Sequence, residues 1–352
     1  MHNLHAILLA GGSGSRFWPA SRRARPKQFL RIVGERPMLA ETFLRLEGMV
    51  GAERCWVVTT PEQAGEVRAA LPELPADQVL VEPCARNTAA AIALASLHVA
   101  RRDPQALQVV LPADHVIRPR SAFQATLRAA CDAAREEPQS LFVFGIHPAH
   151  AATQFGWVKT CGVERVVDAT AVHRVERFVE KPDAARAQAF LDAGGYFWNS
   201  GMFLWSARAF EQALLEFAPA IHAALQEGKD LASAYAALPS ISIDVAVFER
   251  ARNVRMLPID YFWSDVGAWD ALAGVHPADG AGLVQAGGAA LEAIDSRNCI
   301  VWGESGGLIT LVGVEDLIVV RAGDATLVCR RDRAQDVKAL VERLSAKNSE
   351  HL

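Results

Sequence analysis

The chain has 352 residues, of which 51% are hydrophobic and 22% charged, and its formal net charge at pH 7 is −4. This length allows about two domains with a substantial core, and the slightly acidic balance argues against binding to nucleic acid or to an anionic membrane. The longest uncharged apolar stretch, Thr88 to Ala100, is shorter than the ~20 residues that a membrane span needs.

Short apolar runs alternate with alanine-rich amphipathic stretches as far as Trp269. The predicted strands are Ala6–Ala10, Cys55–Thr59, Val79–Val81, Leu107–Leu111, Leu141–Gly145 and Val175–Val179. The predicted helices are Ala40–Met49, Pro61–Ala70, Thr88–Arg101 and Ala122–Arg135. This alternation predicts an α/β fold with right-handed crossovers and a doubly wound, mostly parallel sheet. Ligands of such sheets bind at the carboxyl ends of the strands.

The composition changes at His276, where a segment rich in glycine and alanine extends to Ala290 and predicts a hinge. Short β runs separated by glycine or aspartate follow, namely Cys299–Trp302, Leu308–Val312, Leu317–Val320 and Ala325–Val328. They predict a small β-solenoid or β-roll, and Asp332–Leu344 predicts a capping helix. We therefore expect two domains, residues 1–275 and 276–352.

The loop after the first strand has the features of a phosphate-binding site. Its glycines let main-chain N–H groups reach an anion, while Arg16 and Lys27 supply positive charge. It is not a P-loop, because Arg16 follows GGSGS directly, and it is not a dinucleotide fingerprint, because Phe17 replaces the third glycine. The alternative is a Gly-rich turn with solvated basic residues. The predicted ligand is a nucleotide.

The motif GGSGSRFWPASR…PKQFL, from Gly11 to Leu30, is similar to the opening signature of the sugar-nucleotide pyrophosphorylases, and especially of the bacterial mannose-1-phosphate guanylyltransferases. The similarity continues through Glu82–Thr88, Leu111–His115, Phe178–Pro182, Trp198–Phe203 and Ser264–Trp269. It implies a Rossmann-like, GT-A-like nucleotidyltransferase domain followed by a β-helical domain. A further isomerase domain, which many members carry, does not fit before Leu352.

The resemblance implies transfer of GMP from GTP to α-D-mannose 1-phosphate, which gives GDP-mannose and pyrophosphate for polysaccharide biosynthesis. The attacking phosphate oxygen is already ionised near neutral pH, since its second pKa is about 6, so no general base is required. In-line positioning and charge neutralisation are required instead. Nucleotidyl transfer to another sugar 1-phosphate, or a catalytically idle sugar-nucleotide sensor, remain as alternatives.

Charged residues in the matching motifs carry the expected chemistry. Arg16 is expected on the β- and γ-phosphates and Lys27 near the α-phosphate, both on a solvated loop whose substitution would leave the fold intact. The resemblance assigns Asp114 and Asp265 to Mg²⁺, or Mn²⁺, as oxygen ligands. A helix cap for Asp114 and a turn for Asp265 are the alternatives.

Further contacts follow from the same motifs. Nucleotide contacts are expected from Leu9, Ala10, Gly11, Gly12, Gly14, Ser15, Glu82, Arg86, Asn87 and Asp114. Sugar-phosphate contacts are expected from Gly156, Glu180, Lys181, Asn199 and Asp265, whose hydrogen-bonding groups lie among aromatic residues. Thr88 has the alternative role of a helix cap, and Asp244 is expected to cap a helix over Val245–Ala251.

The six cysteines are scattered, without CxxC pairs, which predicts free thiols. No secretory signal pattern precedes the first strand, so we expect a cytoplasmic protein. We expect no nucleic-acid or membrane partner, and a homodimer. Because short β coils cannot bury both faces alone, the segment from Leu283 onward is expected to support assembly without carrying chemistry.

Overall fold

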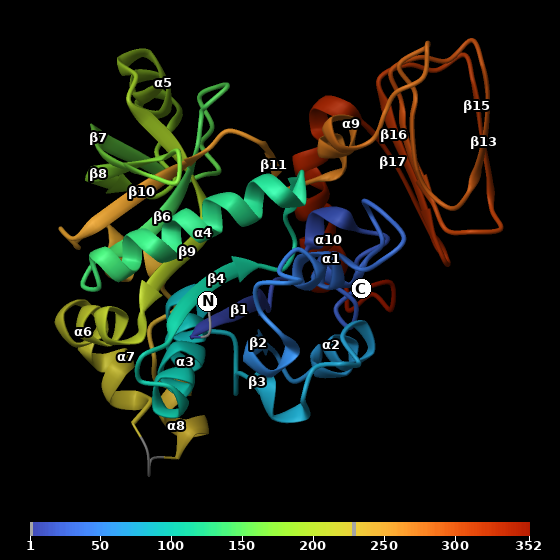
Figure 1. Cartoon of the computed structure of the whole chain (residues 1–352). Coiled ribbons are helices and arrows are strands. Elements are labelled where there is room, and N and C mark those ends of the chain that lie inside the picture. Colours follow the sequence, from blue (N-terminus) through green and yellow to red (C-terminus); the bar gives the residue numbers. More distant parts are fainter. Residues whose placement is uncertain (1–2, 227–229) are drawn as a thin grey trace.

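The computed structural model describes residues 3–226 and 230–352 and is built around a nine-stranded sheet with the order β3-β2-β1-β4-β9-β6-β10-β8-β7 (Figure 1). Its strands are β1 (Leu4–Ala10), β2 (Cys55–Thr59), β3 (Val79–Val81), β4 (Leu107–Pro112), β6 (Leu141–Ile146), β7 (Trp157–Val167), β8 (Thr170–Val179), β9 (Tyr196–Ser206) and β10 (Val254–Ile259). Strands β1, β2, β3 and β4 are mutually parallel, and β6 and β10 are parallel to each other. A separate small pair joins β5 (Val116–Arg118) to β11 (Phe262–Ser264).

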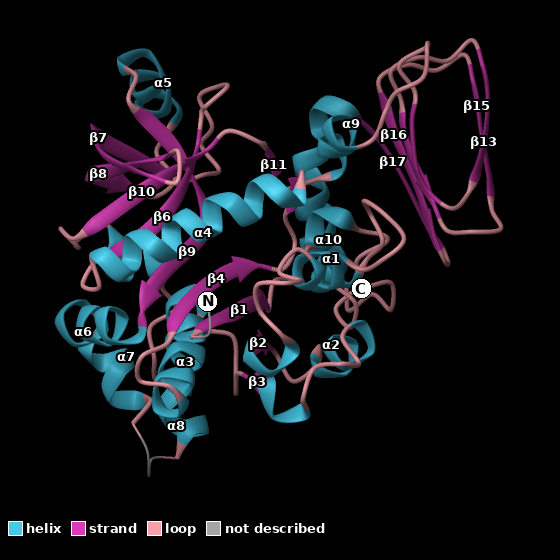
Figure 2. Ribbon diagram, viewed as in Figure 1, coloured by secondary structure: helices cyan, strands magenta, loops and turns pink. Residues whose placement is uncertain are grey.

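Helices cover both faces of the sheet (Figure 2). The helices of the described residues are α1 (Met38–Leu44), α2 (Ala64–Ala70), α3 (Asn87–Arg102), α4 (Arg120–Glu136), α5 (Ala184–Ala193), α6 (Ala207–Phe217), α7 (Pro219–Ala224), α8 (Leu231–Ala236), α9 (Leu272–Val275) and α10 (Val337–Ala346). Of these, α9 and α10 pack with the C-terminal strands instead of the large sheet. One large hydrophobic cluster includes residues of α3 and α6, and another includes residues of α1, α2 and α4. The predicted doubly wound α/β fold is confirmed. No helix in the described ranges is both long and apolar enough to span a bilayer.

Strand β9 was not predicted, and it makes the sheet mixed, because it runs antiparallel to both β4 and β6. Its apolar residues are buried on both faces, so the period-two alternation that marks a half-exposed strand is absent. At its centre the sequence Asn199-Ser200-Gly201 resembles a turn, and Gly201 indeed has a φ of +72°. A buried strand with a local irregularity leaves no clear sequence signal.

The C-terminal strands form a short solenoid, as predicted. They are β12 (Val284–Gly287), β13 (Ala290–Ile294), β14 (Ile300–Gly303), β15 (Leu308–Val312), β16 (Leu317–Ala322) and β17 (Ala325–Arg330). The chain alternates between a parallel β12-β14-β16 sheet and a parallel β13-β15 pair, and β17 then turns back against β16. The predicted hinge segment therefore contains β12 and the start of β13.

One hydrophobic cluster joins this solenoid to the loop after β1. Ile318 of β16 is fully buried in it together with Phe17 and Trp269, whose ring centroids lie 4.7 Å apart. The indole Nε1 of Trp18 donates a hydrogen bond to the main-chain oxygen of His351 at 2.8 Å. The C-terminal segment is thus packed directly against the Gly-rich loop.

The shared cluster predicts a stability cost for truncation of Ile318. We expect Ile318→Ala to lower the free energy of unfolding by ~2–5 kcal/mol, because the methyl groups it removes leave a cavity in a fully buried site. Val328→Ala on β17, which pairs with β16, is the control: Val328 is 60% exposed, and we expect a change below ~0.5 kcal/mol. Urea unfolding measures both, and equal losses would contradict the placement of Ile318.

Candidate active site

The Gly-rich loop leaves β1 at the carboxyl edge of the sheet, with Gly11, Gly12 and Ser13 exposed. Gly14 has a φ of +56°, and a Cβ there would lie 2.6 Å from the Cβ of Lys27. Both the backbone conformation and the close approach therefore require glycine at this position. The loop is folded back onto the segment that carries Lys27.

Lys27 lies at the centre of the candidate site and is only 4% exposed. Its Nζ lies 2.8 Å from Oδ2 of Asp114 and donates hydrogen bonds to the main-chain oxygens of Asp265 at 2.7 Å and Val266 at 3.0 Å. All three donors of the ammonium group therefore have partners. The expectation of a solvated Lys27 is wrong, because the side chain is buried in an ion pair.

Asp114 and Asp265 both lie beside Lys27. Burial favours the protonated form of Asp114, but the Lys27 ammonium and His115 hold the pKa of this carboxyl below its usual value. Burial raises the pKa of Asp265, since the opposing effect of Lys27 is partly offset by the Asp114 carboxylate. One buried ammonium thus stands beside two carboxylates, and this excess of negative charge suits a cation.

Arg16 is part-buried in the short 3-10 turn Ser15–Phe17, which α10 contacts. Its Nε is buried and has no hydrogen-bond partner within residues 3–226 and 230–352. Its positive charge lowers the pKa of Asp265 and of Asp270, although burial raises both overall. A buried donor of this guanidinium thus lacks a partner at the edge of the Gly-rich loop, a cost that an anion accepting from it would offset.

A cavity of about 360 Å³ opens beside the loop. The predicted nucleotide residues that line it are Leu9, Ala10, Gly11, Gly12, Glu82, Asn87 and Asp114. Gly14, Ser15 and Arg86 do not line it. Arg86 instead donates a hydrogen bond to the main-chain oxygen of Ala236. Seven of the ten predicted positions thus meet in one cavity.

One end of the cavity is formed by Glu82 and the start of α3. Glu82 is 5% exposed, accepts a hydrogen bond from the hydroxyl of Tyr235 at 2.6 Å, and has a pKa raised by burial. Asn87 adopts a φ of +63°. Thr88 does not cap α3: its hydroxyl oxygen accepts a hydrogen bond from the main-chain N–H of Ile243 at 2.9 Å, and residue 86 holds the cap position.

A polar cluster of predicted sugar-phosphate residues lies near the other end of the cavity. The main-chain N–H of Asn199 donates a hydrogen bond to the main-chain oxygen of Gly156 at 2.8 Å. A Cβ at Gly156 would lie 2.7 Å from Oε2 of Glu180. Lys181, which is largely exposed, forms an ion pair with Glu180. The ring of Phe155 lies 5.2 Å from that of Trp198. Hydrogen-bonding groups and aromatic faces thus meet here, as expected for a polyol site.

Asp244 belongs to this cluster and does not cap a helix as expected. It starts a π-helical turn, Asp244–Phe248, and accepts a hydrogen bond from Nδ2 of Asn199 at 2.9 Å. Burial and the nearby Glu180 carboxylate raise the pKa of Asp244 to about 7. It also lines the 360 Å³ cavity, which therefore reaches from Glu82 to the polar cluster. The sequence signal was a single carboxylate within the apolar run ISIDVAVF.

Gln28 was also missed by the sequence analysis. It is 3% exposed, and its Nε2 donates hydrogen bonds to the main-chain oxygen of Gly12 at 3.1 Å and to Oε1 of Gln63 at 2.9 Å. Gln28 lines the same cavity, and its hydrogen bond to Gly12 holds the Gly-rich loop in place. Its signal was an amide between the buried residues of PKQFL.

Two family models cover most of the chain. The nucleotidyl transferase model matches residues 5–281, and the MannoseP isomerase/GMP-like beta-helix domain model matches residues 292–344. The chain belongs to the nucleotidyl transferase family. The predicted resemblance to this family is confirmed, and so is the β-helical assignment of the C-terminal strands.

Relatives in this family extend over nearly the whole chain. The chain is 42% identical to the xanthan biosynthesis protein XanB of Xanthomonas campestris, over 98% of this chain and 74% of that protein. It is 40% identical to a mannose-1-phosphate guanylyltransferase of Escherichia coli, over 96% of this chain and 73% of that one. A solved structure from Thermus thermophilus is described as a mannose-1-phosphate geranyltransferase. It superposes with a TM-score of 0.89 at 33% identity, over 97% of this chain and 99% of that one.

The raised pKa of Asp244 predicts a pH-dependent stability. A carboxyl with a raised folded-state pKa stabilises the fold below its unfolded pKa of ~3.9, and this contribution is lost as the pH rises toward 7. The stability of Asp244→Asn relative to the wild type should therefore increase between pH 4 and pH 8, by at most ~4 kcal/mol. Urea unfolding without ligand measures this difference.

Asp168→Asn provides the matched control, because Asp168 is exposed in the turn between β7 and β8 and has a φ of +44°, which asparagine tolerates. Its stability difference from the wild type should vary little between pH 4 and pH 8. If the stability difference between Asp244→Asn and the wild type varied with pH as little as that of Asp168→Asn, the raised pKa of a buried Asp244 would be contradicted.

Proposed function

We propose that this nucleotidyltransferase transfers GMP from GTP to α-D-mannose 1-phosphate and releases GDP-mannose and pyrophosphate. The observation that carries the proposal is the single cavity that joins the Gly-rich loop, Asp114 and the polar cluster around Asp244. The name of the Escherichia coli relative supports the same reaction, and the description of the Thermus thermophilus structure supports mannose 1-phosphate as a substrate. XanB supports a role in polysaccharide biosynthesis.

The nucleotide lies along the first part of the cavity. Gly11 and Gly12 line this part, where their main-chain N–H groups would donate to phosphate oxygens, as in other glycine-rich anion sites. Glu82 uses Oε1 for the Tyr235 hydroxyl, so its second oxygen can accept a hydrogen bond from the amino group of guanine. Asn87, which lines the same wall, adds an amide.

The chemical step is an in-line displacement at the α-phosphorus. An oxygen of mannose 1-phosphate forms the new bond, and the bond to the bridging oxygen of pyrophosphate breaks, so pyrophosphate leaves with the electron pair. Arg16 neutralises the β- and γ-phosphates through its unpartnered guanidinium. Lys27 stands at the junction with Asp114 and Asp265, where the α-phosphate would lie.

A divalent cation, Mg²⁺ or Mn²⁺, fits the donor set of Asp114 and Asp265. Both supply carboxylate oxygens, and the raised pKa of Asp265, caused first by burial, reflects negative charge that Lys27 does not fully offset. No group of three His, Cys, Asp or Glu side chains with metal-binding geometry occurs in the described parts of the chain, so phosphate oxygens and water would complete the shell. When bound, such an ion neutralises phosphate charge.

The sugar phosphate occupies the polar cluster. Glu180 and Asn199 hydrogen-bond sugar hydroxyls, and Gly156 leaves room because a side chain there would meet Glu180. Asp244 orients the amide of Asn199 by accepting from its Nδ2. Lys181, paired with Glu180 at the exposed rim, meets the incoming phosphate. Transfer to a different sugar 1-phosphate remains the second candidate.

The division into domains and the homodimer are further parts of the proposal. We place the domain boundary at residues 275 and 276, where α9 ends before the solenoid. Exposed apolar side chains on β13 and β15, namely Ile294, Leu308 and Val312, support contact with a second copy.

The function is tested by pyrophosphate release across four nucleoside triphosphates and a set of sugar 1-phosphates that includes mannose, glucose and a heptose. We expect the highest kcat/KM with GTP and mannose 1-phosphate. Higher efficiency with another sugar would support the second candidate. No turnover with any pair would reject the transferase assignment.

The positive charges of Arg16 and Lys27 predict how substitution of each residue changes the catalytic rate. Arg16→Ala should lower kcat by 10²–10³, or about 3–4 kcal/mol, with an unchanged melting temperature, because it removes charge that meets phosphate. Lys27→Ala should lower both kcat and the melting temperature, because it leaves the part-buried Asp114 carboxylate and the main-chain oxygens of Asp265 and Val266 without their partner. Arg31→Ala, an exposed arginine just after the motif, should change neither. An unchanged kcat in Arg16→Ala would exclude the phosphate role.

The two carboxylates predict a metal requirement. Activity should vanish in excess EDTA and return with Mg²⁺ or Mn²⁺, and Asp114→Asn should raise the metal concentration needed for half-maximal rate at least tenfold. Asp260→Asn, a change at an exposed carboxylate outside the cavity, serves as the control. Initial rates against metal concentration measure the effect, and full activity in EDTA would remove the metal from the proposal.

A further inference from the structure

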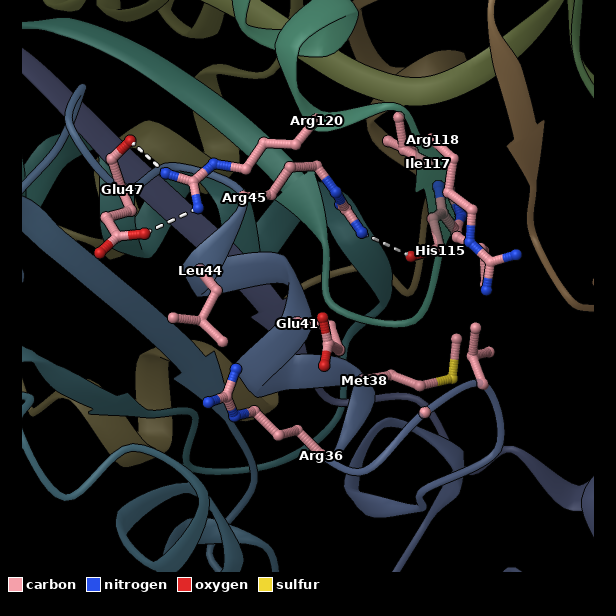
Figure 3. Close-up of a pocket in the computed structure, with 13 residues that line it drawn as sticks. Arg36, Met38, Glu41, Leu44, Arg45, Glu47, His115, Ile117, Arg118 and Arg120 are labelled. Atoms are coloured by element: carbon pink, nitrogen blue, oxygen red, sulfur yellow. Dashed lines mark hydrogen bonds and ion pairs between the residues drawn. The ribbon is translucent and has the colours of Figure 1, made fainter.

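A second cavity, of about 340 Å³, shares no lining residue with the candidate active site. It lies between α1 with the segment that precedes it, β5, and the start of α4 (Figure 3). Four arginines and two glutamates line it, namely Arg36, Arg45, Arg118, Arg120, Glu41 and Glu47. Met38, Leu44 and Ile117 add apolar surface. The cavity is therefore lined mainly by cations and hydrocarbon.

Positive charge exceeds negative charge among these side chains, four arginines to two glutamates. Arg120 pairs with Glu47 at 2.7 Å. Within residues 3–226 and 230–352, Arg36, Arg45 and Arg118 form no ion pair with a carboxylate within 4.0 Å. Arg36 and Arg118 are exposed at the rim. Glu41 is the second carboxylate of the cavity and acts on Arg45, so the excess of positive charge, rather than all three arginines, is available to an outside anion.

Arg45 is the buried member of this set, at 6% exposure. Burial lowers the pKa of its guanidinium to about 10, so it remains charged at neutral pH. Its Nη2 donates one hydrogen bond, to the main-chain oxygen of His115 at 3.0 Å, and the group lies 5.7 Å from the centre of the Phe123 ring. A buried cation without a carboxylate partner is costly, and an anion would offset that cost.

We propose that this arginine pocket binds a phosphorylated small molecule, with Arg45 at its base and Arg36 and Arg118 at its rim. Guanidinium groups bind phosphate oxygens through paired N–H donors. The apolar wall of Met38, Leu44 and Ile117 would cover the uncharged part of the ligand. The volume suits a sugar phosphate or a nucleotide moiety.

The pocket is coupled to the active site through His115. The carbonyl that Arg45 holds belongs to the residue directly after Asp114, and the His115 ring accepts a hydrogen bond from Nε1 of Trp263 at 3.3 Å. Trp263 lies in β11, two residues before Asp265. A phosphate that draws Arg45 away from this carbonyl changes the position of Asp114. This step rests on the proposed function, whereas ligand binding does not.

The binding step is tested with inorganic phosphate, titrated calorimetrically into protein saturated with GDP-mannose, without metal or pyrophosphate. We expect phosphate binding to the wild type and an affinity at least tenfold lower in the double variant Arg36→Gln/Arg118→Gln. Arg128→Gln, a change at an exposed arginine of α4 outside the pocket, should keep the wild-type affinity. Melting temperatures verify that all variants fold.

The stoichiometry of GDP-mannose distinguishes the sources of the phosphate group. Two molecules per wild-type chain and one per double-variant chain would identify the product itself as the ligand. One molecule in both proteins, with phosphate binding lost only in the double variant, would identify a different phosphorylated metabolite. The proposal would be overturned if both proteins bound one GDP-mannose per chain and phosphate either did not bind to the wild type or bound equally well to the double variant.

The coupling step is tested by the metal dependence of the rate. In the wild type, saturating phosphate should change the Mg²⁺ concentration for half-maximal activity at least threefold, and in the double variant it should not. An equal change in both proteins would place the effect at the active site and overturn the coupling. The calorimetric binding does not require turnover. If neither protein bound GDP-mannose, the proposed function would be contradicted, and the comparison of phosphate binding between the two proteins would still test the pocket.

Discussion

The candidate site depends on the buried ion pair of Lys27. A charge that is taken out of water is tolerated only when it is paired and its hydrogen bonds are satisfied. Lys27 meets this condition with Asp114 and with the main-chain oxygens of Asp265 and Val266. One side chain therefore joins three segments that lie far apart in the sequence. The spacing of the two carboxylates, and with it their capacity to hold a cation, follows from that arrangement.

The charges around this ion pair are complementary to the reaction. Two carboxylates share one ammonium, which leaves negative charge for a divalent cation, while the Nε of Arg16 lacks a partner within the described residues. A nucleoside triphosphate brings the opposite combination, an excess of negative charge together with its own metal ion. In the complex that we propose, binding would therefore satisfy Arg16 and Asp265 at once. The unliganded protein holds both groups in place beforehand, so little reorganisation is needed when the substrate arrives.

The sequence predicted β1 to β4 to within a few residues because each is a continuous apolar run. It also predicted seven of the eighteen residues that line the main cavity, because these seven lie at or just after the ends of those strands. It did not predict that Lys27 is buried, since its partners at Asp265 and Val266 are more than 230 residues away. Asp244 was misassigned for the same reason. Its partner Asn199 lies on β9, a strand whose buried, irregular sequence gave no alternation to detect.

The C-terminal domain supports the Gly-rich loop more directly than the sequence suggested. Trp18 donates to the main-chain oxygen of His351, and Arg23 donates to the hydroxyl oxygen of Ser345 at 2.8 Å. Arg22 pairs with Asp324 at 2.8 Å. These contacts fix the residues that follow Arg16, and the buried cluster around Ile318 fixes Phe17 beside it. Although the solenoid supplies no residue to the main cavity, it restricts the conformations of the loop to which we assign phosphate binding.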